Sequence, residues 1–251
     1  MRLGTYTRIA AIVQSRMKSS RLPGKMMLDI SGKPLLMRTL ERVLKIPDIS
    51  VVVLATSPAE ENKVILDLAE RVGVIGFVGD EEDVLDRYYR AAQHVKADSV
   101  VRLTGDCPLL DPNVCHEVVV RFLRGDLDYA SNVAPPTFPD GLDTEIISFD
   151  ALKSIWREAT LRSDREHVTQ FIHRYPERFK TANITASTDI SQLRWTVDES
   201  DDLDFVRDVY RGLSKRGCLG LSYQSVLRIL KEDKLKDASS IYRRNEGLEK
   251  T

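Results

Sequence analysis

The sequence has little of several features that mark specialised protein classes. Its 251 residues contain three cysteines, Cys107, Cys115 and Cys218, at no spacing typical of zinc ligands, which favours a reducing compartment over a disulfide-bonded secreted protein. The apolar run near the N-terminus, 9–13, is too short for a signal-peptide core or a membrane span. We therefore expect a cytoplasmic protein that is neither exported nor inserted into a membrane.

An excess of charge of one sign is also missing. The chain has 37 basic and 38 acidic residues, a formal net charge of -1 and no long run of either sign. This balance argues against a protein that binds polyanions with its whole surface, and we expect no nucleic-acid partner. Neither a GxxxxGK[ST] nor a GxGxxG motif is present, so any recognition of phosphate must come from another local cluster.

Short β-branched runs alternate with longer segments of helical period. Strands are expected at 8–13, 51–55, 74–78 and 99–103. Helices are expected at 34–45, 58–72 and 81–95, where apolar residues recur three and four positions apart. This alternation is typical of an α/β protein in which a mainly parallel sheet is covered by helices. Ligands bind such sheets beyond the carboxyl ends of the strands.

The pattern loosens after about residue 128. We expect a small inserted lobe at about 130–190, after which the sheet resumes at 193–197 and a helix follows at 201–213. A helical, charged tail is expected at about 222–251. The 42% apolar content over this length is enough for a single large domain, 1–251, that carries this lobe and tail.

The loop after the first expected strand is strongly basic. In "QSRMKSSRLPGK", Gln14 to Lys25, four basic side chains accompany three serines, and Pro23-Gly24 allows a tight turn. Cationic side chains and exposed N–H groups together make a concave anion site that suits a triphosphate.

Two carboxylates are expected at strand ends on the same edge. Asp106 follows the strand in "VRLTGDCPLLDP", and Asp198 follows "RWTV". Carboxylate oxygens suit Mg²⁺ when phosphates complete its coordination. Each residue also has a structural alternative: Asp106 can form a turn, and Asp198 can cap a helix that begins near Ser200.

These motifs carry a resemblance to a known family. Together with "GKPLL", "ATS", "DVLDRYYRAA", "DYASN", "FPDGLDTEI" and "DREHVTQFI", they resemble, in order, the cytidylyltransferases typified by CMP-KDO and CMP-acylneuraminate synthetases, over about residues 8–212. The closer match is the spore coat polysaccharide biosynthesis protein F branch. The resemblance implies a three-layer α/β/α, Rossmann-like fold of the nucleotide-diphospho-sugar transferase type. It also implies transfer of CMP from CTP to an acidic acceptor, with Mg²⁺ as cofactor, in surface polysaccharide biosynthesis.

The resemblance also implies roles for individual residues. Catalysis would involve Arg16, Lys25 and Asp106, and Mg²⁺ would bind Asp106 and Asp198. The nucleotide-binding residues it implies are Gln14, Ser15, Arg16, Ser19, Ser20, Arg21, Lys25, Ala55, Asp86, Arg87 and Thr104. The acceptor-binding residues it implies are Asn132, Asp140, Asp143, Glu145, Arg165 and His167. The chain departs from the CMP-KDO synthetases in carrying Thr104 in place of Gln and Cys107 in place of an acidic residue.

The acceptor side leaves more alternatives open. Arg165 has a planar guanidinium that suits a carboxylate or a phosphonate, and His167 suits hydrogen bonding or proton transfer near neutral pH. The same segment can also be explained as a helix start capped by Ser163 or Asp164. His173 has no partner at ligand spacing and is expected on the surface or in packing. Nonulosonic acids, other sugar acids and phosphonates all remain candidate acceptors.

Two other functions compete with CMP transfer. A metal-dependent glycosyltransferase would hold a sugar nucleotide through an Asp-x-Asp motif at a strand end, but the pairs at 126–128 and 202–204 are expected in unsuitable places. A catalytically inactive nucleotide-binding protein is the non-enzymatic alternative, and the presence of Lys25, Asp106 and Asp198 argues against it. By resemblance, we expect a homodimer that associates through residues near 130–190.

Overall fold

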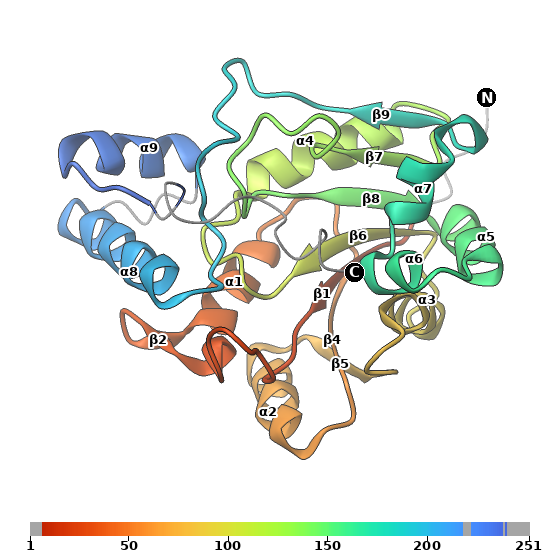
Figure 1. The fold of residues 1–251 in the computed structure, drawn as a ribbon, viewed down its shortest axis with the longest axis horizontal. Helices are drawn as coiled ribbons and strands as arrows, with labels where there is room; N and C mark the ends of the chain where they lie inside the picture. Colours follow the sequence, from red (N-terminus) through yellow and green to blue (C-terminus); the bar gives the residue numbers. More distant parts are fainter. Residues whose placement is uncertain (1–6, 218–221, 238, 240–251) are drawn as a thin grey trace.

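A single seven-stranded sheet organises the computed structural model, which describes residues 7–217, 222–237 and 239. Figure 1 shows the strands in the order β5-β4-β1-β6-β8-β7-β9. Their bounds are β1 (Ile9–Gln14), β4 (Val51–Thr56), β5 (Ile75–Val78), β6 (Ser99–Thr104), β7 (Tyr129–Ser131), β8 (Glu145–Ser148) and β9 (Thr181–Asn183). The first four predicted strands are confirmed as β1, β4, β5 and β6, which pair in parallel.

Helices cover both faces of this sheet. They are α1 (Leu35–Val43), α2 (Lys63–Val72), α3 (Val84–His94), α4 (Pro112–Leu123), α5 (Phe149–Glu158), α6 (Arg162–His167), α7 (Gln170–Arg174), α8 (Ser200–Lys215) and α9 (Tyr223–Glu232). One buried core joins the sheet to α1, α2, α4, α8 and α9, and a second joins it to α3, α5 and α7. Along β1, Ile9 and Ala11 face the first core whereas Ala10 and Ile12 face the second. The predicted three-layer α/β/α arrangement is therefore confirmed.

The block at 130–190 extends the sheet instead of folding apart from it. It contributes β8, which pairs antiparallel with β6 and β7, and β9, which pairs in parallel with β7. The helical part of this block consists of α5, α6 and α7. The predicted tail begins with α9, while residue 238 and residues 240–251 lie outside the described part of the chain.

The sheet does not resume at 193–197, so this prediction was wrong. The segment instead runs along the loops at the carboxyl edge of the sheet: Trp195 N–H donates to the carbonyl of Asp140 (2.7 Å), and Val197 N–H donates to that of Asp106 (2.9 Å). Trp195 and Val197 are fully buried, and this burial gave the segment its strand-like apolar pattern. The consequence is that Asp198 is carried to Asp106 by a bridging segment and not by a strand.

Short elements complete the edge where the loops gather. A hairpin of β2 (Asp29–Ile30) and β3 (Lys33–Pro34) follows a 3₁₀ turn, η1 (Lys25–Met27), and a second 3₁₀ turn, η2 (Glu60–Asn62), follows β4. A third, η3 (Pro176–Arg178), lies elsewhere, just before β9. Gly24, with φ at 70°, adopts the left-handed conformation that turns the basic loop into η1. Within the described residues, no helix has the length and apolar character needed to cross a membrane.

Candidate nucleotide and acceptor site

Two adjoining cavities open at the carboxyl ends of the strands. The first, which we call the loop cavity, has a volume of about 370 Å³ and lies along the basic loop. The second, which we call the sheet-end cavity, has a volume of about 640 Å³ and lies beside β6 and β8. Both are lined by Arg21, Thr104, Asp106 and Asp198. A ligand that spans the two cavities must therefore pass the two predicted metal-binding carboxylates.

The loop cavity brings together most of the residues predicted to bind the nucleotide. Its lining includes Gln14, Ser15, Arg16, Ser19, Ser20, Arg21, Lys25, Thr104, Asp106 and Asp198. The buried Gln14 Oε1 and Ser15 Oγ atoms have no hydrogen-bond partner among the residues that the structure describes. Buried polar atoms are normally satisfied, so these two atoms support a polar ligand in this cavity.

Lys25 lies at the centre of the site. Its ammonium donates to Asp106 Oδ2, to Asp198 Oδ1 and to the carbonyl oxygen of Val197, each at 2.8 Å. The lysine side chain is only 7% exposed. Burial acts to lower the pKa of Lys25, but the charges of the two carboxylates outweigh it, and the pKa is raised. Lys25 is therefore a fixed positive charge at the junction of the cavities.

The same cluster keeps Asp106 ionised. Burial favours the neutral carboxyl, but the charge and hydrogen bond of Lys25 outweigh it, and the pKa of Asp106 is lowered. Arg21 adds a further positive charge, with Nη2 3.0 Å from Asp198 Oδ1. Arg21, one of the predicted nucleotide-binding residues, thus also holds a predicted metal ligand.

The start of α8 fixes the position of Asp198. Glu199 is the N-cap of this helix and forms a capping box with Asp202, so the alternative in which Asp198 caps the helix is wrong. Asp202 Oδ2 accepts the backbone N–H groups of Asp198 and Glu199 at 2.9 and 3.0 Å. The side chain of Asp198 is consequently directed toward the cavities and is not needed by the helix.

Arg194 connects the two cavities. Its Nε and Nη2 donate to the two carboxylate oxygens of the buried Asp202, at 2.9 and 3.0 Å, and Nη2 also donates to Asp198 Oδ2 at 3.2 Å. Its Nη1 lies 3.7 Å from Asp140 Oδ2. Burial opposes the charge, yet the bonds and charge of Asp202 outweigh it, and the pKa of Arg194 is raised. Arg194 thereby fixes one residue of each cavity.

The carboxylates of Asp106 and Asp198 fit a divalent cation. Both already converge on a single ammonium at 2.8 Å, beside a backbone carbonyl oxygen, so hard oxygen donors surround one cationic position. Within the described residues, no group of three or more His, Cys, Asp or Glu side chains could hold a metal by itself. Mg²⁺ commonly binds through one or two carboxylates, with water and substrate phosphates completing its shell. The donor set therefore suits a cation that arrives with a triphosphate.

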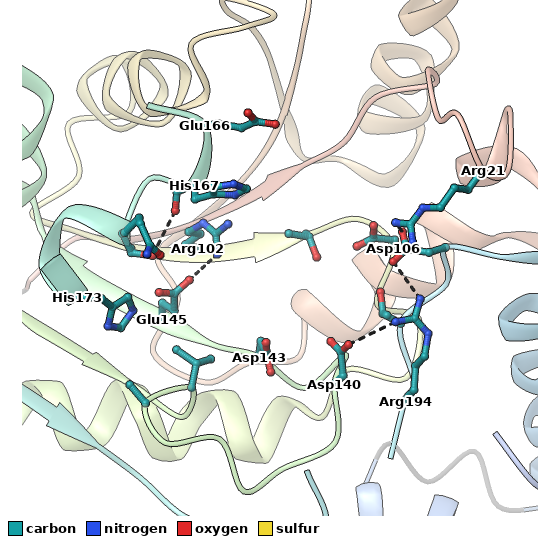
Figure 2. A pocket seen from close by; sticks show the side chains of 17 residues that line it. Arg21, Arg102, Asp106, Asp140, Asp143, Glu145, Glu166, His167, His173 and Arg194 are labelled. Atoms are coloured by element: carbon teal, nitrogen blue, oxygen red, sulfur yellow. Dashed lines mark hydrogen bonds and ion pairs between the residues drawn. The ribbon is translucent and has the colours of Figure 1, made fainter. Parts of the chain in front are cut away.

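The sheet-end cavity contains four of the predicted acceptor residues: Asp140, Asp143, Glu145 and His167. Figure 2 shows Arg102, Glu145, His167 and His173 gathered on one side, with Arg21, Asp106 and Arg194 on the other. Charged and hydrogen-bonding groups thus lie at both ends of the cavity.

Glu145 is a buried member of this group. Its carboxylate forms an ion pair with Arg102 and accepts the Tyr129 hydroxyl at 2.6 Å. Burial acts to raise the pKa of Glu145, but the charge of Arg102 and the hydrogen bonds outweigh it, and the pKa is lowered. The pair lies at β6 and β8, because Arg102 and Glu145 are register partners in these strands. Glu145 is therefore an ionised part of the cavity wall.

The environment of His167 favours the neutral form of its imidazole. Burial, helped by the charge of Arg102 and opposed by Glu166, lowers the pKa of His167 below its ordinary value of 6.5. A group with this pKa can accept a proton at neutral pH. His173, predicted to be a surface or packing residue, also lines the cavity, and its ring packs edge-on against Tyr129.

Three predicted nucleotide-binding residues do not line either cavity. Ala55 is fully buried within β4. Asp86 on α3 accepts the Trp156 indole N–H at 2.7 Å, and the buried Arg87 donates to the carbonyl of Asp80 at 2.7 Å. The side chains of Asp86 and Arg87 are therefore committed to packing around α3.

Two predicted acceptor residues are likewise engaged elsewhere. Arg165 Nε lies 3.0 Å from both carboxylate oxygens of Asp83, and Nη1 donates to the carbonyl of Trp156 at 2.7 Å. Asn132 is buried and bridges backbone groups of the following loop. The alternative cap by Ser163 or Asp164 is also wrong, because α6 has Leu161 at its N-cap.

Several cavity residues escaped the sequence analysis. Arg102, Thr169, Gln170, Arg194 and Thr196 line the sheet-end cavity. Arg102 did leave a signal, since a charged residue interrupts an apolar strand two positions before Thr104, on the same face. Arg194 left no such signal in the sequence, because its contacts depend on the segment 193–197, which was predicted as a strand.

Comparison with known proteins adds independent information. A family model described as cytidylyltransferase matches residues 10–214. An uncharacterized protein of Methanocaldococcus jannaschii is 34% identical over 197 residues, which cover 78% of this chain and 80% of that protein. Spore coat polysaccharide biosynthesis protein SpsF of Bacillus subtilis is 29% identical over 215 residues, which cover 83% and 88%.

Two further likenesses concern another named relative and a solved structure. The 3-deoxy-manno-octulosonate cytidylyltransferase of Chloroherpeton thalassium is 36% identical over 115 residues, which cover 45% of each chain. The solved structure of a cytidylyltransferase from Leptospira borgpetersenii superposes with a TM-score of 0.85 at 29% identity, covering 91% of this chain and 95% of that one.

Proposed function

This chain belongs to the cytidylyltransferase family, and we propose that it transfers CMP from CTP to an acidic sugar or phosphonate acceptor and releases pyrophosphate. The observation that carries this proposal is the cluster of Lys25, Asp106 and Asp198 at the junction of the two cavities. It places a fixed cation and two metal-binding carboxylates between a basic loop and a second polar cavity. Such a site suits a triphosphate on one side and its acceptor on the other.

The reaction requires one bond to form and one to break. An acceptor oxygen attacks the α-phosphorus, a new O–P bond forms, and the bond from that phosphorus to the oxygen shared with the β-phosphate breaks. Negative charge develops on the α-phosphate oxygens and on the departing pyrophosphate. Arg16 and Lys25, which line the loop cavity, are placed to stabilise this charge without a covalent intermediate.

Mg²⁺ would be held by Asp106 and Asp198 together with phosphate oxygens of CTP. When bound, it would neutralise phosphate charge and act as a Lewis acid. The chain's own contribution is to hold both carboxylates in one place, through Lys25 and Arg194. The oxygen donors of Asp106 and Asp198 suit a hard divalent cation such as Mg²⁺.

The sheet-end cavity supplies candidate groups for the acceptor. His167 can take the proton of the attacking hydroxyl, since its lowered pKa leaves the imidazole neutral near pH 7. Because Arg165 does not line the cavity, recognition of the acceptor's acidic group falls to Arg102 and to the cations at the junction. Names of relatives that concern spore coat polysaccharide and 3-deoxy-manno-octulosonate support an acidic sugar in polysaccharide synthesis.

The geometry does not favour a glycosyltransferase. Asp126 pairs with Lys180, and Asp202 pairs with Arg194, so neither Asp-x-Asp segment presents two aspartates to a cavity.

The proposed test is pyrophosphate release with Mg²⁺, using each of the four nucleoside triphosphates against a panel of sugar acids and phosphonates. Acceptor-dependent release with CTP alone is expected. Equal release with all four nucleotides, or turnover of an intact sugar nucleotide, would contradict the proposal.

By resemblance, we also infer a homodimer in the cytoplasm. The expected contact region is the block near 130–190, which includes the edge strand β9. Light scattering coupled to size-exclusion chromatography tests this inference, and a monomer at micromolar concentration would overturn it.

A further inference from the structure

We propose that Asn62 is a positioning residue for CTP, an inference that rests on the proposed function. Asn62 does not line the loop cavity, and its side chain acts through the backbone of the basic loop. The role follows from three hydrogen bonds of one buried amide and from the loop residues that these bonds hold.

The amide of Asn62 joins two loops. Asn62 is 2% exposed, its Oδ1 accepts the backbone N–H of Met17 at 2.8 Å, and its Nδ2 donates to the Ser57 carbonyl and hydroxyl oxygens at 3.1 and 2.9 Å. Met17 belongs to the basic loop after β1, and Ser57 directly follows β4. Every polar atom of this side chain therefore bridges the two loops.

The bridge lies just beyond the point where the sheet stops joining these chain segments. The last backbone hydrogen bond between them runs from Ser15 N–H to the carbonyl of Ala55, at 3.0 Å. Two residues later, the Asn62 amide takes the place of the missing backbone partner. The carbonyl of Met17 also accepts the N–H of Gly24 at 3.2 Å, which closes the loop on itself.

Arg16 gains most from this arrangement. Its two neighbours, Ser15 and Met17, are both held to the β4 side, whereas the Arg16 side chain is exposed and lines the loop cavity. A loop that is held in place before the ligand arrives loses less conformational entropy on binding. Removing the amide should consequently weaken binding of the phosphates more than it weakens contacts to the nucleoside.

Asn132 provides a matched control. It is also a buried asparagine whose amide joins backbone groups: Nδ2 donates to the Leu142 carbonyl and Oδ1 accepts the Thr144 N–H, both at 2.8 Å. The loop that it holds carries Asp140 and Asp143 of the sheet-end cavity, not the basic loop. An Asn→Ala change at either position removes the same chemistry from a different cavity.

The experiment is isothermal titration of CTP and of CMP, each with Mg²⁺, into wild type, Asn62→Ala and Asn132→Ala. We expect Asn62→Ala to weaken CTP binding by about tenfold, CMP binding by much less, and Asn132→Ala to stay within about twofold for both. Thermal unfolding of both variants measures their general loss of stability. If Asn62→Ala does not fold, Ser57→Ala, which removes one of the three bonds, should weaken CTP binding by about twofold to threefold.

Unchanged CTP affinity in Asn62→Ala, or in Ser57→Ala where that variant is used, would overturn the inference. Equal weakening of CTP binding by Asn62→Ala and Asn132→Ala would also overturn it, because the effect would then come from a general loosening of the protein structure. Equal weakening of CTP binding and CMP binding by Asn62→Ala would mean that Asn62 has no particular role in binding the phosphates. Failure of the wild type itself to bind CTP would instead count against the proposed function.

Discussion

The loop cavity and the sheet-end cavity differ in how directly the sequence encodes them. In the loop cavity, the basic loop and the carboxylates of Asp106 and Asp198 meet at Lys25, as the residues predicted, although Asp198 reaches it on a bridging segment and not on a strand. In the sheet-end cavity, the side chains of Arg165 and Asn132 form structural bonds, while Arg102 and Arg194, which were not predicted as site residues, line the cavity. The predicted phosphate and metal residues follow from residue types in the loops at the carboxyl edge of the sheet, whereas the lining of the sheet-end cavity depends on long-range packing.

The largest expected effect is that of Lys25→Ala. Loss of the central cation should lower turnover by about a hundredfold or more, because positioned charge is removed from the developing pyrophosphate. The control is Lys33→Ala, which removes a lysine that also pairs with a carboxylate, Glu41, but is 41% exposed. Steady-state pyrophosphate release checks both variants, and normal turnover in Lys25→Ala would contradict the proposed role.

Lys25→Ala should also change the stability of the protein, although a lysine in a loop would not ordinarily be expected to affect it. The variant leaves Asp106 and Asp198 close together without their shared ammonium. We expect a lower melting temperature than in wild type, and a larger rise on addition of Mg²⁺ because the cation can compensate both carboxylates. Identical responses of the two proteins to Mg²⁺ would argue against a metal at these carboxylates.

Arg194→Lys tests the connection between the cavities. Lysine keeps the charge but cannot reproduce the paired bonds to Asp202, so we expect a loss of about 2 kcal/mol in the free energy of unfolding. Asp198 should also be held less firmly, which raises the Mg²⁺ concentration needed for half-maximal turnover. Arg207→Lys, on the exposed face of α8 beside Asp204, is the control. An unchanged Mg²⁺ requirement would reduce Arg194 to a purely structural role.

Glu145→Gln sharpens the electrostatic account of the sheet-end cavity. The folded pKa of Glu145 lies below its ordinary value of 4.5, so its contribution is complete above that pH and is lost as the pH falls through the lowered folded value. We expect wild type to exceed the variant by about 1.5 kcal/mol in unfolding free energy at pH 7. Urea titrations from pH 7 to below 4 should show this gap narrowing. A gap that widens in acid would mean that the ion pair with Arg102 does not stabilise the carboxylate.

Arg165→Gln has the smallest expected effect. Its partly exposed pair with Asp83 contributes about 1 kcal/mol at most, so the free energy of unfolding should fall by no more than that. Turnover and the acceptor KM should stay at wild-type values, because the guanidinium is not in the cavity. A raised acceptor KM with unchanged stability would restore the role that the resemblance implied for Arg165.

The fold was predictable where local pattern and topology agree. Apolar runs such as Val51–Thr56, separated by amphipathic helices, lead to a parallel sheet, and the carboxyl ends of its strands must meet at one edge. The insertion of β8 between β6 and β7 was not predictable in this way, because antiparallel pairing across a long, proline-rich connection leaves no periodic signal. Residues 193–197 show the limit most clearly, since burial alone made a bridging segment resemble a strand.

The same distinction applies to the site residues. Lys25 and Asp106 could be predicted as site residues because Lys25 lies in the basic loop that follows β1 and Asp106 lies just after β6, at the same edge of the sheet. Asp86, Arg87 and Arg165 carry suitable charges, but the packing of α3 against its neighbours uses them first. Residue type therefore predicts a site residue only where the backbone carries its side chain to the cavity wall.

The most direct test of the account is equilibrium binding of CTP with and without Mg²⁺, compared with UTP, ATP and GTP, in wild type and in Asp106→Asn. The account predicts saturable binding that prefers CTP, is strengthened by Mg²⁺ by about tenfold or more, and loses this Mg²⁺ dependence in the variant. Equal affinity for all four nucleotides, or CTP binding that is indifferent both to Mg²⁺ and to Asp106, would contradict it.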